Sequence, residues 1–204
     1  MGDYLRLLTL SDRIIPLVDL QRAATTGAVW SVDHPGMLGN YLAIGPVLNE
    51  NQNVWATVER NPVGPNTLGA EEVAEFIDRL ESGGPPSAVR WLADYLEGVR
   101  AIYAIRIYPD SMTTNEADAF KAVFAVRSAL RHAIGGIGQW DGLGFTNEED
   151  RLIWTDPSMN PTGRSAAAIL DESTGGWIPF DLELDDHDEL ELFVRGEIKP
   201  RRQG

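Results

Sequence analysis

The segment 101–108, with the sequence AIYAIRIY, is the clearest structural signal in the chain. Its residues are mostly apolar and are rich in isoleucine and tyrosine, and Pro109-Asp110 follows directly. A short run of this composition, ended by turn-forming residues, predicts a β-strand. The chain therefore contains a sheet, and the remaining patterns indicate which segments join it and which cover it.

Further strands and helices are predicted on both sides of this segment. Alternating or continuous apolar runs predict strands at Tyr4–Leu10, Ala28–Val32, Tyr41–Leu48, Asn53–Glu59, Gly138–Trp140, Leu143–Thr146 and Arg151–Thr155. Apolar residues spaced at three and four positions, together with capping signals, predict helices from Ser11 or Asp12 to Ala24, over Val73–Leu80, from Ser87 to Val99, from Thr113 to Leu130 and, in one short piece, over Ser165–Leu170.

This order of elements predicts an α+β fold, with a mixed or antiparallel sheet and helices on one face. A strand and a helix followed by antiparallel strands occur twice, which suggests two ferredoxin-like (split βαβ) halves. The expected halves are 1–99, and 100–204 with an acidic hairpin near its C-terminal end. The alternative is one domain over 1–198 that carries a basic tail at 199–204.

The charge of the chain excludes several partners. There are 31 Asp and Glu residues against 17 Lys and Arg, a formal net charge of -14, and three of the cations lie in 199–204. Residues 1–198 therefore carry -17. No basic patch is visible for phosphate groups, so we expect no binding to nucleic acid or to an anionic membrane.

Other features of the composition bear on location. The chain has no cysteine, which excludes disulfides and thiolate metal sites and suits a reducing compartment. We see no basic segment followed by an apolar one that would indicate a signal peptide, and no apolar run long enough to span a bilayer. We therefore expect a cytoplasmic protein.

The segment 171–191 is strongly acidic, with nine Asp and Glu residues and no Lys or Arg. Apolar residues alternate in it, at Phe180, Leu182 and Leu184 and again at Leu190, Leu192 and Val194, which predicts a hairpin with the loop Asp186-His187-Asp188. Its register would place Glu183 opposite Glu191 and Asp185 opposite Glu189. Like charges in such pairs are destabilising and no cation is available within the segment to offset them.

Three interpretations of this acidic segment remain open. The first is a solvated edge whose charges prevent aggregation. The second is a surface for a basic protein partner, and the third is a cation site formed by Asp185, Asp186 and Asp188, although the spacing does not match a calcium-binding EF-hand loop. The candidate binding residues are Glu183, Asp185, Asp186, Asp188, Glu189 and Glu191, together with Trp140 as an exposed aromatic anchor beside the turn Asp141-Gly142.

No catalytic residue is predicted. The three histidines, His34, His132 and His187, have neighbouring polar groups but no triad arrangement, and His132 is better explained as a group near a helix C-terminus. The glycine-rich run 135–144 follows a helix and precedes a hairpin, which is the reverse of a dinucleotide-binding loop, so it predicts a helix stop and a tight turn. We expect neither a metal nor a cofactor.

The leading hypothesis is a non-enzymatic protein that binds a basic protein partner, such as a bacterial inhibitor or immunity-type protein. A second hypothesis is an enzyme or small-molecule binder whose site lies between the halves, with loops 33–39 and 159–164 bringing His34 or Arg164 near two carboxylates. A third is an oligomeric scaffold in which the acidic edge pairs with a second copy. The sequence does not fix the oligomeric state.

Overall fold

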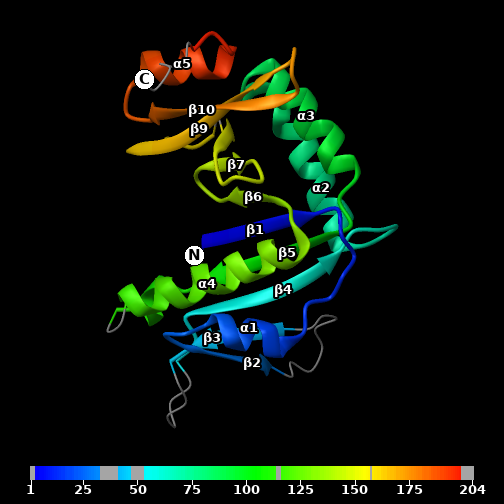
Figure 1. Cartoon of the computed structure of the whole chain (residues 1–204), viewed down its shortest axis with the longest axis vertical. Coiled ribbons are helices and arrows are strands. Elements are labelled where there is room, and N and C mark those ends of the chain that lie inside the picture. The colour runs from blue at the N-terminus through cyan, green and yellow to red at the C-terminus, as the bar shows by residue number, and fades with distance from the viewer. Residues whose placement is uncertain (1–2, 33–40, 47–52, 114–115, 157, 199–204) are drawn as a thin grey trace. The chain divides into compact units, whose positions relative to one another are not determined.

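The computed structural model describes residues 3–32, 41–46, 53–113, 116–156 and 158–198 (Figure 1). The chain forms two compact units, and each is built from two separate stretches of sequence. Unit 1 comprises Met1–Gly69 and Arg100–Gly136, and unit 2 comprises Ala70–Val99 and Ile137–Gly204. One boundary thus falls at the expected junction of the halves, and each unit draws residues from both sides of it. None of the described helices is long and apolar enough to cross a membrane.

Unit 1 contains an antiparallel sheet of five strands in the order β1-β5-β4-β3-β2. The strands are β1 (Asp3–Thr9), β2 (Ala28–Val32), β3 (Tyr41–Gly45), β4 (Ala56–Pro62) and β5 (Ala101–Ile107). The predicted strand at 101–108 is confirmed as β5, which is paired on both sides, with β1 and with β4. The connection between the predicted strands Tyr41–Leu48 and Asn53–Glu59 lies outside the described residues.

Two helices of unit 1, α1 (Leu17–Ala23) and α4 (Glu116–Ile134), pack against each other and against the sheet (Figure 1). The first helix begins at Leu17, later than predicted, because Pro16 is its N-cap and the chain before it is extended. Leu5, Ile105 and Val58 form one row across three strands, since their positions are paired in register. All three are buried, and the predicted apolar helix residues Val123 and Leu130 are buried with them.

Unit 2 contains a mixed sheet in the order β6-β7-β8-β9-β10, in which only β8 and β9 run parallel. Its strands are β6 (Ile137–Trp140), β7 (Gly144–Thr146), β8 (Leu152–Thr155), β9 (Arg164–Asp171) and β10 (Gly176–Glu183). Its helices are α2 (Leu68–Arg79), which begins at the end of the unit 1 stretch, a 3₁₀ turn η1 (Leu80–Ser82), α3 (Pro86–Glu97) and α5 (His187–Arg195).

The helices of unit 2 lie against both faces of the strand pair β9–β10, not against one face as predicted. Trp177 and Phe180 point to opposite faces of β10 because they are three positions apart and successive side chains of a strand alternate between its faces. The ring of Trp177 packs edge-on against Trp91 of α3, with centroids 5.1 Å apart. Phe180 packs against Phe193 of α5, with centroids 6.0 Å apart. An apolar core therefore lies between the sheet and α5, formed by Leu152, Ala167, Phe180, Leu182, Leu184 and Phe193.

Glycines have distinct roles in two segments, and those at 135 and 136 form the helix stop that was predicted. Gly135 and Gly136 end α4 with backbone φ angles of 66° and 122°, which residues other than glycine rarely adopt. Gly83 approaches the backbone of β8 so closely that an added Cβ would lie 2.1 Å from the Thr155 carbonyl oxygen. The Gly83 carbonyl accepts hydrogen bonds from the N–H and the hydroxyl of Thr155, at 2.7 and 3.0 Å.

The prediction of a short helix at Ser165–Leu170 was wrong, because these residues form most of strand β9. Alanine is the strongest helix former, and three alanines in succession favoured a helix locally. Pairing with β10 over the whole length of β9 outweighs that preference. Ala167 and Ala168 are both fully buried, one on each face of the strand.

Candidate functional site

The acidic residues singled out in the sequence lie on strand β10, on helix α5 and in the turn between them, and not on a hairpin. The prediction of a second strand at 190–194 was wrong, because His187–Arg195 forms α5. The carboxylate of Asp186 caps this helix, accepting hydrogen bonds from the N–H groups of Asp188 and Glu189, each 3.1 Å long. Gly196 ends the helix in the left-handed conformation, with φ of 72°.

The helical register explains why the alternating pattern misled the prediction. Leu190, Phe193 and Val194 are spaced at three and four positions, so they share one side of a helix. Phe193 is fully buried, whereas Leu192, which a strand would have turned inward, is 41% exposed. The predicted pairs of Glu183 with Glu191 and of Asp185 with Glu189 therefore do not form.

Two arginines lie among these carboxylates. The guanidinium of Arg164, at the start of β9, contacts Asp181 at 2.7 Å and Glu183 at 3.4 Å. The hydrogen bond to Asp181, followed by the charges of Asp181 and Glu183, holds the pKa of Arg164 above its usual range. Arg195 forms an ion pair with Glu191, one helical turn earlier in α5. The segment 171–191 itself contains no cation, as its sequence shows, and the arginines that pair with its carboxylates come from outside it.

Two of the carboxylates also have structural roles. Asp185 accepts a hydrogen bond of 2.7 Å from the N–H of Gly163, and this fixes the turn after β10 against the loop before β9. Asp186 caps α5 as described above. The carboxylates of Asp188 and Glu189 make no hydrogen bond or salt bridge within the part of the chain that the structure describes. The charge of Glu189 contributes to the raised pKa of Arg164.

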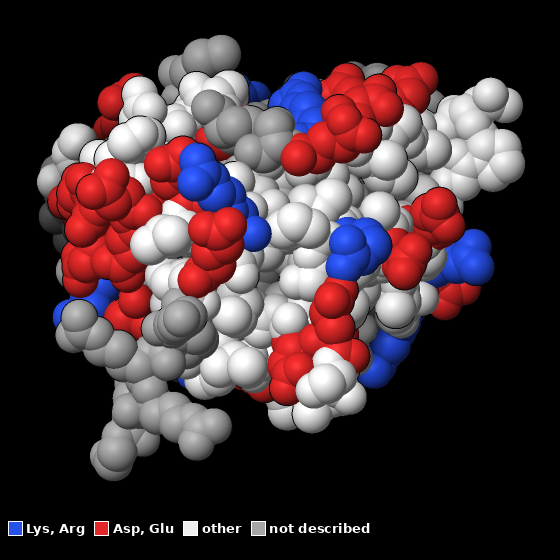
Figure 2. Space-filling model, turned by 90° about the horizontal axis from the view of Figure 1, so that it is seen from above, with Lys and Arg blue, Asp and Glu red and all other residues white. Residues whose placement is uncertain are grey.

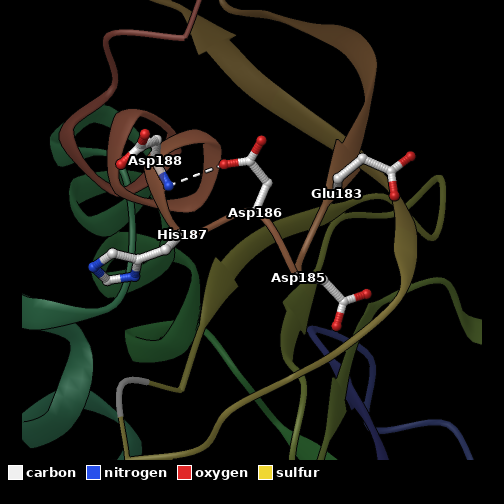
Figure 3. Close-up of a pocket in the computed structure, with 5 residues that line it drawn as sticks. All are labelled: Glu183, Asp185, Asp186, His187 and Asp188. Carbon is white, nitrogen blue, oxygen red and sulfur yellow. Dashed lines mark hydrogen bonds between the residues drawn. The ribbon is translucent and has the colours of Figure 1, made fainter.

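Five of these residues, Glu183 and the run 185–188, line an open depression on the surface (Figure 3). Their side chains point in different directions: Asp185 and Asp186 diverge, and His187 and Glu183 lie at opposite sides of the view (Figure 3). A hard cation needs several oxygen atoms directed at one point. Among the described residues there is no group of three or more Asp, Glu, His or Cys side chains placed to hold a metal ion.

The surface charge seen from above is divided rather than continuous. Figure 2 shows acidic side chains in several separate groups, with basic side chains bordering some of them and uncharged surface between. The segment 181–195 and Arg164 together contain seven carboxylates and two guanidiniums, on β10, in the turn after it, on α5 and at the start of β9. This region, defined as 181–195 together with Arg164, is called the acidic surface below.

The remaining candidate residues are placed as follows. Trp140 ends β6 at the predicted tight turn, and its side chain is half-buried; its role as an anchor stays a prediction. His187 is exposed at the start of α5, and His132 lies in the last turn of α4. His34 and the loop 33–39 lie outside the described residues, as does the basic tail at 199–204.

Asp171 accepts hydrogen bonds from Ser173 and Thr174, which hold the pKa of its carboxyl below the usual range.

Sequence reasoning missed the two arginines for different reasons. Arg195 follows Glu191 by four residues, a spacing that places the two side chains together only once 187–195 is recognised as a helix. The signal for that helix was present in the capping residue Asp186, the acids of the first turn and the terminal Gly196. Arg164 and Glu183 are paired in register across β9 and β10, and no local signal in the sequence reveals that pairing.

No protein-family model, curated protein or solved structure matches this chain significantly.

Proposed function

We propose that this chain is a non-enzymatic protein that binds a basic protein partner through the acidic surface on β10 and α5. The observation that carries the proposal is the excess of seven carboxylates over two guanidiniums in the acidic surface, which comprises the end of β10, the turn after it, α5, and Arg164 of β9. Complementary potential of this kind steers a cationic partner toward the surface and raises the rate of association.

The packing of α5 supports this proposal. The helix is held from below by Phe193 and from its start by Asp186, so its outer side is fixed in place without using Asp188 or Glu189. Charges on a rigid element lose little conformational freedom when a partner binds. An acidic edge needed only for solubility would not require this local order.

The class of protein that fits these features is an inhibitor of a basic enzyme, such as a bacterial immunity-type protein that neutralises a cationic toxin or nuclease. Such a protein needs a stable fold and a complementary surface, and it needs no catalytic group. A cytoplasmic location accompanies the proposal and is supported by the absence of cysteine. The relation of each half to a ferredoxin-like fold likewise remains a proposal.

The test uses the double variant Asp188→Asn, Glu189→Gln, which removes two charges and preserves the shape of the side chains and the Asp186 cap. The full-length protein is immobilised, a partner is recovered from host lysate at low salt and purified, and the association rate is then measured. We expect the double variant to associate several-fold more slowly than the unchanged protein, and we expect salt to slow the unchanged protein more than the variant.

A matched control is the pair Glu116→Gln, Asp118→Asn in the first turn of α4. It also removes one Glu and one Asp charge from the first turn of a helix, but in unit 1, where Asp118 forms an ion pair with Lys121. The control pair should associate nearly as fast as the unchanged protein. Equal slowing by both pairs would show that only net charge matters, and no slowing by either would remove the acidic surface as the contact site.

A further inference from the structure

A pocket of about 250 Å³ lies within unit 1, between the sheet and the chain at 14–20. Its floor is a row of side chains across three strands, because Ser31 pairs with Leu42 and Leu42 pairs with Val58. Arg60 and Tyr103, paired across β4 and β5, also line the pocket. The remaining lining residues, all apolar, belong to the chain that covers the floor: Ile14, Ile15, Pro16, Leu17 and Leu20.

Two hydrogen bonds hold the covering chain in place. The Nη2 atom of Arg60 donates to the carbonyl oxygen of Asp12 at 2.8 Å, and the hydroxyl of Tyr103 donates to the carbonyl oxygen of Arg13 at 2.9 Å. The extended segment before α1 is therefore tied to the sheet just before it passes over the pocket. Ile14 is nevertheless 60% exposed, so this cover includes apolar surface that faces water.

Arg60 is the one charged residue among the described residues that line the pocket, and its guanidinium contains an unsatisfied donor. Its Nε atom is buried and has no hydrogen-bond partner among the residues that the structure describes. A buried donor of a charged group without a partner is costly, and native structures rarely leave one unpaired. The Nη2 atom donates to the Asp12 carbonyl oxygen, and Nε itself has almost no accessible surface, so an acceptor reaches Nε only when the side chain of Arg60 shifts.

We propose that this pocket binds a small aliphatic monocarboxylate, with the carboxylate at Arg60 and the hydrocarbon tail over Leu42 and Val58. A carboxylate is an acceptor that a guanidinium binds strongly, because the opposite charges of the two groups strengthen the hydrogen bond between them. The tail would lie among seven apolar lining side chains, whose burial favours a hydrocarbon group over a polar one. The inference does not depend on the acidic surface of unit 2.

The volume and the lining limit the ligand further. We take roughly 30 Å³ for each non-hydrogen atom, which is the volume of one water molecule in the liquid. The pocket of about 250 Å³ then holds about eight such atoms, the size of a six-carbon carboxylate. None of the ten lining residues in the described part of the chain is acidic, so none of them offers a counterion to an ammonium group. The pocket therefore selects a simple carboxylate over a free amino acid of similar size.

The experiment titrates the full-length, isotopically labelled protein with hexanoate and follows the backbone amide signals of Ser31, Leu42 and Val58 by NMR. Hexanol and leucine serve as ligands of similar size that lack the charge or add an ammonium group. We expect hexanoate at millimolar concentration to shift these three signals, and we expect much smaller shifts with hexanol and with leucine.

Three variants locate the charge that is responsible. Arg60→Met keeps the apolar stem and should weaken hexanoate binding about tenfold or more while leaving hexanol binding within about twofold. Arg22→Met removes a charge from the exposed side of α1 and should bind hexanoate as the unchanged protein does. Tyr103→Phe removes the other tie to the covering segment, and it should still prefer hexanoate over hexanol.

The proposal is overturned if hexanoate leaves the three signals unmoved, if hexanol shifts them as strongly, or if Arg60→Met and Arg22→Met behave alike. Should Arg60→Met fail to fold, Arg60→Lys keeps a charge but lacks Nε, and the comparison of hexanoate with hexanol in the unchanged protein still decides the outcome. Loss of preference in Tyr103→Phe would mean that the covering segment, and not the guanidinium, creates the selectivity.

Discussion

Asp186 stabilises α5 through its carboxylate oxygen, which accepts two backbone hydrogen bonds at the start of the helix. Removing that acceptor leaves two N–H groups dependent on water alone. We therefore predict that Asp186→Ala lowers the free energy of unfolding by about 1 kcal/mol, while Asp186→Asn, which keeps a side-chain oxygen, lowers it by much less. Urea unfolding of both variants measures this. Equal losses would show that the charge of Asp186, and not its role as an acceptor, stabilises the helix.

At the scale of the element, burial of Phe193 and exposure of Leu192 distinguish the helix α5 from the strand predicted there. Phe193 is fully buried against Phe180, and Leu192 is on the outer side. We predict that Phe193→Ala costs about 3–5 kcal/mol of stability and Leu192→Ala less than about 1 kcal/mol. The hairpin suggested by the alternating pattern would give the opposite ranking, since it turns Leu192 inward and Phe193 outward. Denaturant unfolding of the two variants distinguishes these outcomes.

Most of the elements were predictable because their signals were local. The strands at β1, β2, β5 and β8 and the helices α2, α3 and α4 follow from apolar spacing and from breaks at glycine and proline. The two errors concern the neighbouring segments 165–170 and 190–194. Both are short, and in both the local pattern fits helix and strand almost equally well. Pairing with β10 decides the first, and burial of Phe193 decides the second.

The candidate site was predictable only in part, for the same reason. The identities of the acidic residues come directly from the sequence, but their arrangement depends on the element that carries each of them. The pocket at Arg60 gave no sequence signal, because its lining comes from five segments between Ile14 and Tyr103. Only the strand register brings Ser31, Leu42 and Val58 into one row.

At the scale of the whole molecule, unit 1 is interrupted by the 70–99 stretch of unit 2. The ends of this insertion lie close together in unit 1, since the N–H of Val63 donates to the carbonyl of Arg100 at 2.8 Å and Pro62 pairs with Ala101. We predict that a variant with residues 1–136, in which a short Gly-Ser linker replaces 70–99, folds cooperatively. Circular dichroism during heating checks this. A broad transition without a clear midpoint would contradict the prediction.

The interruption also has a consequence for biosynthesis. Helices α2 and α3 leave the ribosome before the strands they pack against, because Phe76 contacts Phe145 and the Leu80 carbonyl accepts a hydrogen bond from Trp154. At translation rates of about 5–20 residues per second, these helices wait roughly 2–8 seconds before β6 begins to emerge. Unit 1 is fully synthesised within that interval. Its completion therefore precedes that of unit 2, and the nascent chain exposes the apolar faces of α2 and α3 to chaperones in the meantime.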